Sequence, residues 1–148
     1  MMIDLDKFKY INDEYGHASG DKVLLEVSKV IIDSVRHSDI ACRVGGEEFA
    51  IIFRRADEQC VRVIAETLRS KMEKLPIETN GETLFVTGSI GVATYRGDSE
   101  VECSQDQLYK HADSAMYYSK ESGRNQATHF DDIAEAVLLV LQTAHNHF

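Results

Sequence analysis

The chain has 148 residues, of which 43% are hydrophobic and 28% are charged. This length suits one domain, large enough to fold without disulfides or structural metals. Its 25 acidic and 16 basic residues give a formal net charge of −9, which opposes binding to nucleic acid or to an anionic membrane surface. With a single proline and no apolar run long enough to span a bilayer, neither disorder nor a membrane contact is expected.

The cysteines and the N-terminus are typical of a cytoplasmic domain. Cys42, Cys60 and Cys103 are odd in number, lie far apart and form no C-x-x-C pair. A disulfide framework or a zinc ribbon is therefore not supported, and the thiols are expected to be reduced. Residues 1–5 lack the basic region of a signal peptide. They are typical of a buried strand, as though the chain began inside a domain.

The first part of the chain predicts a strand, a loop and a helix. Residues 1–5 are an apolar run that ends in acid. Residues 6–20 are polar and punctuated by glycine, which favours a loop or a short helical turn. A helix is predicted from Asp21 onward, because apolar residues recur at helical spacing: Val23, Leu24, Val27, Val30, Ile31 and Val35.

Two hairpins and a second helix are predicted next. Residues 41–44 and 49–53 are strand-like and flank Gly45-Gly46, which is a hairpin signal. The apolar spacing of residues 60–72 predicts a helix, which Pro76 stops. Asn80-Gly81 then predicts a second hairpin, whose long arm, residues 82–95, is expected to be a central strand.

The C-terminal part predicts a helix, a strand and a helix. Ser104 and Gln107 fit a capping box for a helix that reaches about Ser122. Residues 126–130 suit a short strand, and residues 133–141 have the spacing of an amphipathic helix. The order β-α-β-β-α-β with additions predicts a ferredoxin-like α+β palm, in which a central, mostly antiparallel sheet is flanked by helices.

Two acidic pairs are candidates for metal chemistry. Asp4 and Asp6 end the first strand, and alternation along a strand sends both the same way. Glu47 and Glu48 follow the two glycines of the first hairpin. Solvated acids would also explain each pair taken alone. On strands of the same sheet, however, the two pairs together form a carboxylate cage for one or two metals that bridge phosphates.

Two polar groups are candidates for nucleotide contacts. Asn12 and Asp21 carry the amide and carboxylate that suit a guanine edge, although capping and turn formation would also explain them. Lys120 and Arg124 lie on either side of Gly123 and suit phosphates, although cations at a helix C-terminus are favourable without a ligand. The sequence has no Walker-type phosphate loop, so phosphoryl chemistry would depend on metal and side chains.

These groups occur in one ordered pattern. D-x-D-x-F-K-x-I-N-D-x-x-G-H-x-x-G-D begins at Asp4, and R-V-G-G-E-E-F begins at Arg43. S-I-G-V-A then begins at Ser89, and A-D-x-A-M-Y-x-x-K-x-x-G-R-N begins at Ala112. From about Met1 to about Asn125, the chain resembles the GGDEF family of diguanylate cyclases in its GGEEF form. The resemblance implies an adenylyl-cyclase-like palm that condenses two molecules of GTP into cyclic di-GMP and releases two pyrophosphates.

The resemblance also implies residue roles. Mg²⁺ or Mn²⁺ would be held by Asp4, Glu47 and the backbone carbonyl of Leu5. Glu48 would complete the acidic site near the 3′-hydroxyl, and either glutamate would assist proton removal. The guanine would be read by Asn12 and Asp21, with His17 in the same pocket segment. The triphosphate would be bound by the backbone amides of Lys7 and Phe8 and by the side chains of Lys120 and Arg124.

The family's chemistry implies a homodimer and a second site. One domain binds one GTP, so two domains would face each other in antiparallel fashion. Arg36 and Asp39 fit the family's inhibitory R-x-x-D, at which cyclic di-GMP would bind as product and inhibitor. A further arginine of that site would come from the next helix, where Arg62 and Arg69 are both candidates.

The chain also departs from the family pattern. The family normally begins with an earlier helix and a D-x-L-T-G-L-x-N-R-like motif, so residues 1–130 are expected to be a catalytic domain without its N-terminal part. A sensory domain would lie upstream in the parent chain. Residues 131–148 are expected to be an amphipathic extension that packs on the sheet or joins a dimer interface. The alternatives are a non-catalytic module that senses GTP or cyclic di-GMP, and, more remotely, a polymerase palm.

Overall fold

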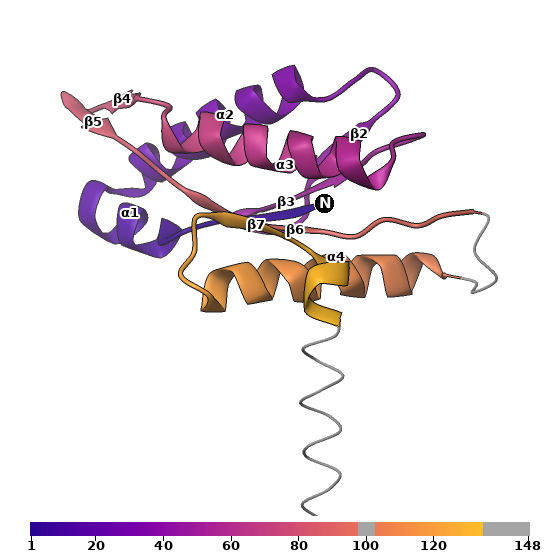
Figure 1. Cartoon of the computed structure of the whole chain (residues 1–148). Coiled ribbons are helices and arrows are strands. Elements are labelled where there is room, and N and C mark those ends of the chain that lie inside the picture. The colour runs from indigo at the N-terminus through magenta and orange to yellow at the C-terminus, as the bar shows by residue number, and fades with distance from the viewer. Residues whose placement is uncertain (98–102, 135–148) are drawn as a thin grey trace, which may run out of the picture.

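The computed structural model describes residues 1–97 and 103–134 (Figure 1). It contains helices and strands in mixed order, as an α+β domain requires. In chain order they are β1 (Met2–Leu5), α1 (Phe8–Tyr15), α2 (His17–Ser34), β2 (Ile40–Arg43), β3 (Glu48–Ile52), α3 (Glu58–Glu73), β4 (Ile77–Thr79), β5 (Glu82–Leu84), β6 (Gly88–Val92), α4 (Gln105–Glu121) and β7 (Gln126–His129).

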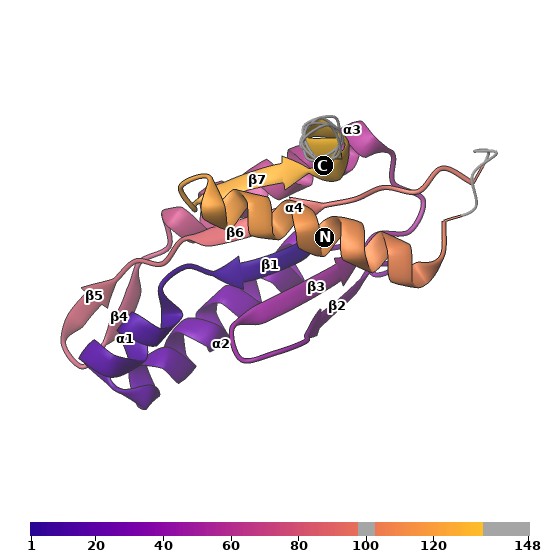
Figure 2. The ribbon, with the colours of Figure 1, turned by 90° about the horizontal axis from the view of Figure 1, so that it is seen from below.

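A five-stranded sheet in the order β2-β3-β1-β6-β7 forms the centre of the domain. All neighbouring strands are antiparallel except β6 and β7, which are parallel. Helices α2 and α3 cover one face of the sheet, and α4 covers the other (Figures 1 and 2). This arrangement confirms the predicted palm, and it places β1 with its two acids between β3 and β6.

The main core lies between the sheet and the helices α2 and α3. It contains fully buried side chains from four elements: Ile3, Val23, Leu68, Met72 and Ile90. A smaller cluster of Met2, Ala112 and Met116 joins α4 to the opposite face. Helices α2, α3 and α4 therefore turn their apolar residues toward the sheet, as the spacing predicts.

The polar segment after β1 differs from its prediction. Residues 6–20 were expected to form a loop or a short turn, but α1 and the start of α2 are helical. Phe8 and Ile11, spaced three residues apart, are buried in the core and hold α1 against the domain. Gly16, at φ +90°, separates the two helices. The helix α2 therefore begins at His17, before Asp21.

The long arm of the second hairpin is also divided. The turn at Asn80-Gly81 is confirmed, since β4 and β5 pair on either side of it. These two strands form a separate sheet, and the chain leaves extended pairing before β6 begins at Gly88. As predicted, β6 is an inner strand of the main sheet, between β1 and β7. The single strand predicted over residues 82–95 is therefore wrong, because its two ends belong to different sheets.

The first hairpin and the helix caps follow the sequence closely. Strands β2 and β3 pair as predicted, and Arg43 Nε donates to the carbonyls of Gly45 and Gly46 at 3.0 Å each. Ser104 and Gln107 form the expected capping box of α4. None of the helices within residues 1–97 and 103–134 has the length and apolar character needed to cross a bilayer.

The predicted C-terminal extension, residues 131–148, is described only in its first part. Residues 130–134 are helical, and Ile133 is buried. Asp132 pairs with Arg62 of α3 at 2.7 Å, and the ring of Phe130 stacks on His111 of α4. Residues 135–148, which carry most of the predicted amphipathic helix, lie outside the described residues.

Candidate active site

Two carboxylates meet at the end of the central strands. Asp4 of β1 lies directly opposite Glu48 of β3 in the antiparallel register. Asp4 is 3% exposed, and its Oδ2 lies 2.7 Å from Nζ of Lys120, on α4. Burial raises the pKa of Glu48, and the hydrogen bond and negative charge of Asp4 raise it further, against the opposing effect of Lys120. Two acids from different strands therefore share one small region with a single nearby lysine.

The donor set of this region fits a divalent metal. Carboxylate and carbonyl oxygens are the ligands that Mg²⁺ and Mn²⁺ prefer. Burial, and next the proximity of Asp4, raise the pKa of Glu48, so further positive charge beside the pair would stabilise the ionised form of Glu48. Glu47 is half-buried at the end of the hairpin, where its carbonyl accepts a hydrogen bond from the N–H of Leu5 at 3.1 Å. The three residues predicted as metal ligands thus lie on adjacent backbone segments.

A cavity of about 460 Å³ is lined in part by the residues that directly follow β1. Lys7 and Arg124 line it, with Asp6 and Asn125 beside them. Lys7 has left-handed backbone angles and caps the start of α1. Phe8, the other residue predicted to bind the triphosphate through its backbone, turns its side chain into the core and is not among the residues that line the cavity. The structure therefore brings Lys7 and Arg124, predicted as triphosphate contacts, to one hollow.

The residues predicted to read guanine lie where α1 meets α2. Asn12 is on α1, and Asp21 is on α2 next to Gly20. A Cβ on Gly20 would stand 1.8 Å from Oδ1 of Asn12, so only glycine lets the amide lie this close to α2. Asp21 and His17 are exposed. Asn12 thus lies against the residue that precedes Asp21, and His17 begins the same turn of α2.

The R-x-x-D pair forms a compact ion pair between α2 and β2. Arg36 Nε and Nη2 donate to the two oxygens of Asp39 at 3.1 and 3.0 Å. Asp39 also accepts from the backbone N–H groups of Arg36 and Arg54. The Arg36 side chain is 48% exposed and that of Asp39 only 1%. Hydrogen bonds from Arg36 hold the pKa of Asp39 below its ordinary value.

The two arginines considered as additional members of that site are both engaged within the domain. Arg62 pairs with Glu58 and Asp132, and its guanidinium pKa is raised by these hydrogen bonds. Arg69 pairs with Glu66 and Glu73 and donates to Asn125 Oδ1 at 2.9 Å. The structure therefore gives Arg62 and Arg69 contacts that tie α3 to the C-terminal strand and its flanks.

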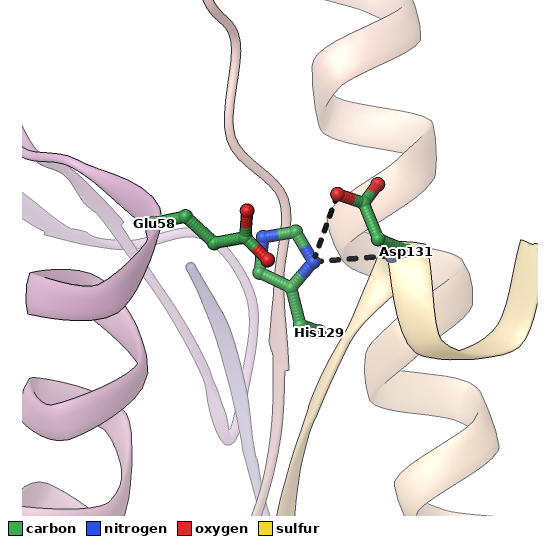
Figure 3. A group of neighbouring side chains, drawn as sticks. All are labelled: Glu58, His129 and Asp131. Carbon is green, nitrogen blue, oxygen red and sulfur yellow. Dashed lines mark hydrogen bonds and ion pairs between the residues drawn. The ribbon is translucent and has the colours of Figure 1, made fainter.

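A polar cluster around His129 was missed by the sequence reasoning. Figure 3 shows Glu58 and Asp131 on opposite sides of the imidazole of His129, which is 3% exposed. Nδ1 accepts from the Asp131 N–H at 3.1 Å, so Nε2 carries the proton and donates to Thr94 Oγ1 at 3.0 Å. Burial, and next the charge of Arg62, lower the pKa of His129.

These contacts argue that the cluster is structural. Carboxylate and imidazole atoms of Glu58, His129 and Asp131 lie within 4.8 Å of one another, which is metal-ligand proximity. Both ring nitrogens already have protein partners, however, and Glu58 is paired with Arg62 and Arg96. The neutral imidazole thus joins the end of β7 to Thr94, just after β6. No sequence signal links these positions, because they come from separate elements.

Comparison with known proteins shows which protein family the chain is similar to. The family described as "Diguanylate cyclase, GGDEF domain" matches residues 1–126. Diguanylate cyclase A of Treponema denticola is 44% identical over 128 residues, which are 86% of this chain and 34% of that protein. Cyclic di-GMP phosphodiesterase NbdA of Pseudomonas aeruginosa is 40% identical over 130 residues, 88% of this chain and 16% of that protein. The chain therefore spans a third or less of the length of these curated relatives.

Solved structures agree with the sequence comparison. The GGDEF domain of DgcB from Caulobacter crescentus, in complex with c-di-GMP, matches with a TM-score of 0.81 and 33% identity. The match covers 88% of this chain and 75% of that one. The family model, the related sequences and the solved structures agree. The chain belongs to the GGDEF family of diguanylate cyclase domains.

Proposed function

We propose that this domain is a diguanylate cyclase that condenses two molecules of GTP into cyclic di-GMP and two pyrophosphates. The 3′-oxygen of each GTP attacks the α-phosphorus of the other, and pyrophosphate leaves in line. One observation carries the proposal: Asp4, Glu48 and Lys120 meet on the sheet, at the same end of β1 as the cavity lined by Lys7 and Arg124. Acid and cation groups are thus arranged as a phosphoryl-transfer site needs them.

The chain's own residues have distinct tasks in this reaction. The backbone N–H groups of Lys7 and Phe8 and the side chains of Lys120 and Arg124 bind phosphate oxygens. The two cationic side chains also offset the negative charge that develops in the transition state. Glu48, which lies opposite Asp4 in the register and beside the proposed metal ligands, accepts the 3′-hydroxyl proton. Asp4, Glu47 and the Leu5 carbonyl would hold Mg²⁺ or Mn²⁺, which supplies charge neutralisation at the phosphates when bound.

Catalysis by a homodimer follows from the geometry of the product. Both phosphodiester bonds of cyclic di-GMP join two nucleotides symmetrically. A single domain with one base-reading pair, Asn12 and Asp21, holds one of these nucleotides. Two copies that face each other bring both 3′-oxygens to the opposite α-phosphates. The rate per chain is therefore expected to rise with protein concentration, and an input domain in the parent protein would drive pairing.

A direct assay tests the proposal. The purified chain, at several concentrations, is incubated with GTP and Mg²⁺, and cyclic di-GMP is measured by chromatography. We expect Glu47→Ala to lower turnover by about a hundredfold or more, as loss of a group that stabilises the transition state does. The control Glu78→Ala changes an exposed glutamate on β4 whose hydrogen bond is to Thr83, and it is expected to keep the parent rate.

The alternative function gives a different result. A sensor module binds GTP or cyclic di-GMP but makes no product at any protein concentration. Binding of both nucleotides is therefore measured by calorimetry in the same samples. Equal turnover by Glu47→Ala and Glu78→Ala would contradict the metal assignment. Binding without turnover in the dimeric state would favour the sensor.

Product inhibition is part of the proposal. Arg36 and Asp39 occupy the positions of the family's inhibitory motif, and nearly half of the Arg36 side chain is exposed to a ligand. The related GGDEF domain of DgcB was solved in complex with c-di-GMP, which supports binding of the product by a domain of this family. Arginine suits such a ligand, because its planar guanidinium binds phosphate in a bidentate manner and stacks on bases.

A further inference from the structure

Asp6 is the second acid of β1's C-terminal end, and its environment differs from that of Asp4. It is 7% exposed. Its Oδ2 accepts from Thr87 Oγ1 at 2.7 Å and from the backbone N–H of Asn125 at 3.0 Å, and its Oδ1 accepts from Ser89 Oγ at 2.6 Å. Both carboxylate oxygens are therefore occupied by donors from within the domain.

The loop that Asp6 contacts is unusual in its backbone. Gly123, Arg124 and Asn125 have φ angles of +118°, +62° and +44° in succession. Side chains with a Cβ rarely adopt such angles, and they keep them only where surrounding contacts require it. The Arg124 N–H is bonded to the Ser119 carbonyl at 3.0 Å, and the next N–H of the loop is the one that Asp6 accepts.

The side chain of Asn125 holds the same loop from the other side. Its Nδ2 donates to Glu73 Oε1 at 3.0 Å, and its Oδ1 accepts from Arg69 Nη1 at 2.9 Å. The Arg69 side chain is only 16% exposed, and Glu66 and Glu73 fix its guanidinium. The hydrogen bond from Asn125, and next that from Arg69, hold the pKa of Glu73 below its ordinary value.

These contacts surround the residue that is proposed to bind phosphate. Arg124 lies between Gly123 and Asn125, and all three line the cavity with Lys7 and Asp6. We propose that Asp6 and Asn125 are positioning residues: they fix the left-handed loop so that Arg124 faces the triphosphate of GTP. Asp6 acts through the loop and not on a metal, because its oxygens already accept three hydrogen bonds. This inference rests on the proposed function.

A double-mutant cycle tests whether Asp6 acts through Arg124. The dissociation constant for GTP is measured by calorimetry for the parent chain, Asp6→Asn, Arg124→Ala and the double variant. Each single change is expected to weaken binding about tenfold, the size of one charge-assisted hydrogen bond. The double variant is expected to match Arg124→Ala, because a displaced loop costs nothing further once the guanidinium is gone. Asp33→Asn, an exposed acid on α2, is the control.

The measurements distinguish failure of the positioning role from failure of the proposed function. A double variant about a hundredfold weaker than the parent would show independent effects and overturn the positioning role, while leaving the proposed function intact. No GTP binding by the parent chain would overturn both. Should Asp6→Asn fail to fold, Asn125→Gly replaces it, since glycine keeps the left-handed backbone and the N–H but removes the contacts to Arg69 and Glu73. It is expected to weaken GTP binding several-fold, and only when Arg124 is present; unchanged binding would contradict the inference.

Discussion

At the scale of single residues, the acidic pair shows a conflict between stability and function. Asp4 and Glu48 are placed opposite each other although burial, and next the hydrogen bond and charge of Asp4, make ionisation of Glu48 less favourable. Lys120 offsets part of this repulsion through its contact with Asp4. A binding site that awaits a cation and phosphates is expected to carry such uncompensated charge, which a purely structural sheet would avoid.

Glu48→Gln is therefore expected to stabilise the metal-free domain. The pKa of Glu48 is raised above its ordinary value of 4.5, so the folded state loses stability as the pH rises through that pKa. Glutamine removes this effect. At pH 7 we expect a gain of about 1 kcal/mol in the free energy of unfolding and about 2–4 °C in Tm, with loss of cyclase turnover.

Thermal unfolding at several pH values checks this prediction. The difference in Tm between parent and Glu48→Gln is expected to shrink below about pH 4.5, where the parent's glutamate is protonated as well. The exposed Glu78→Gln serves as the control, with no stabilisation at either pH. A Glu48→Gln variant that is less stable than the parent at pH 7 would contradict the repulsion between the two acids.

At the scale of elements, the contact of α4 with β6 holds Lys120 at the site. A Cβ on Gly91 would lie 2.1 Å from the carbonyl oxygen of Ala112 and from the backbone nitrogen of Met116. The helix thus lies directly on the strand, at a distance that only glycine permits. Because Lys120 is near the end of α4, the distance between its ammonium and Asp4 depends on this packing.

Gly91→Ala is expected to push α4 away from the sheet. Backbone atoms cannot yield as a flexible side chain can, so the free energy of unfolding should fall by about 3 kcal/mol, at the upper end for overpacking. Denaturant unfolding measures this loss. Gly97→Ala is the matched control, since no atom of residues 1–97 and 103–134 lies within 4 Å of its added Cβ. Similar stability of the two variants would mean that α4 does not depend on this approach.

The elements also show what the sequence can and cannot predict. Apolar spacing, glycine turns and the capping box predicted α3, α4, the first hairpin and the inner strand β6, because these signals are local. Helix α1 was missed, since only Phe8 and Ile11 anchor it and the rest of it is polar. The break between β5 and β6 was missed because pairing partners decide it: β5 pairs with β4 in a two-stranded sheet, while β6 pairs with β1 and β7.

At the scale of the whole molecule, the sequence predicted those residues of the candidate site that belong to recognisable motifs. The sequence paired the acids of β1 with those of the hairpin, and the register places Asp4 opposite Glu48. Strand alternation alone does not distinguish Asp4 from Asp6, and only the family resemblance assigned the metal to Asp4. The fold separates them, because Ser89, Thr87 and Asn125 come from distant parts of the chain to surround Asp6. Contacts of this kind leave no local signal.

The proposed inhibitory site lies at the opposite end of β2 from the signature hairpin. Asp39 precedes the strand, and Gly45 follows its end. At about 3.3 Å per residue, the five residues between them span roughly 17 Å. Product bound at Arg36 would therefore lie outside the cavity proposed for GTP in the same chain, whose lining does not include Arg36, and inhibition would act through the geometry of the domain pair. Such inhibition is expected not to compete with GTP.

Arg36→Ala tests this site more cleanly than a change of Asp39. The Asp39 carboxylate also accepts the backbone N–H groups of Arg36 and Arg54, so its removal would disturb the turn itself. Loss of the Arg36 guanidinium is expected to raise the inhibition constant of cyclic di-GMP by about tenfold or more, the cost of its charge-assisted contacts. Cyclase rates with added cyclic di-GMP measure it, with the exposed neighbour His37→Ala as control. Equal inhibition of both variants would place product binding elsewhere, because His37 shares the turn but lacks a group that can grip a phosphate in a bidentate manner.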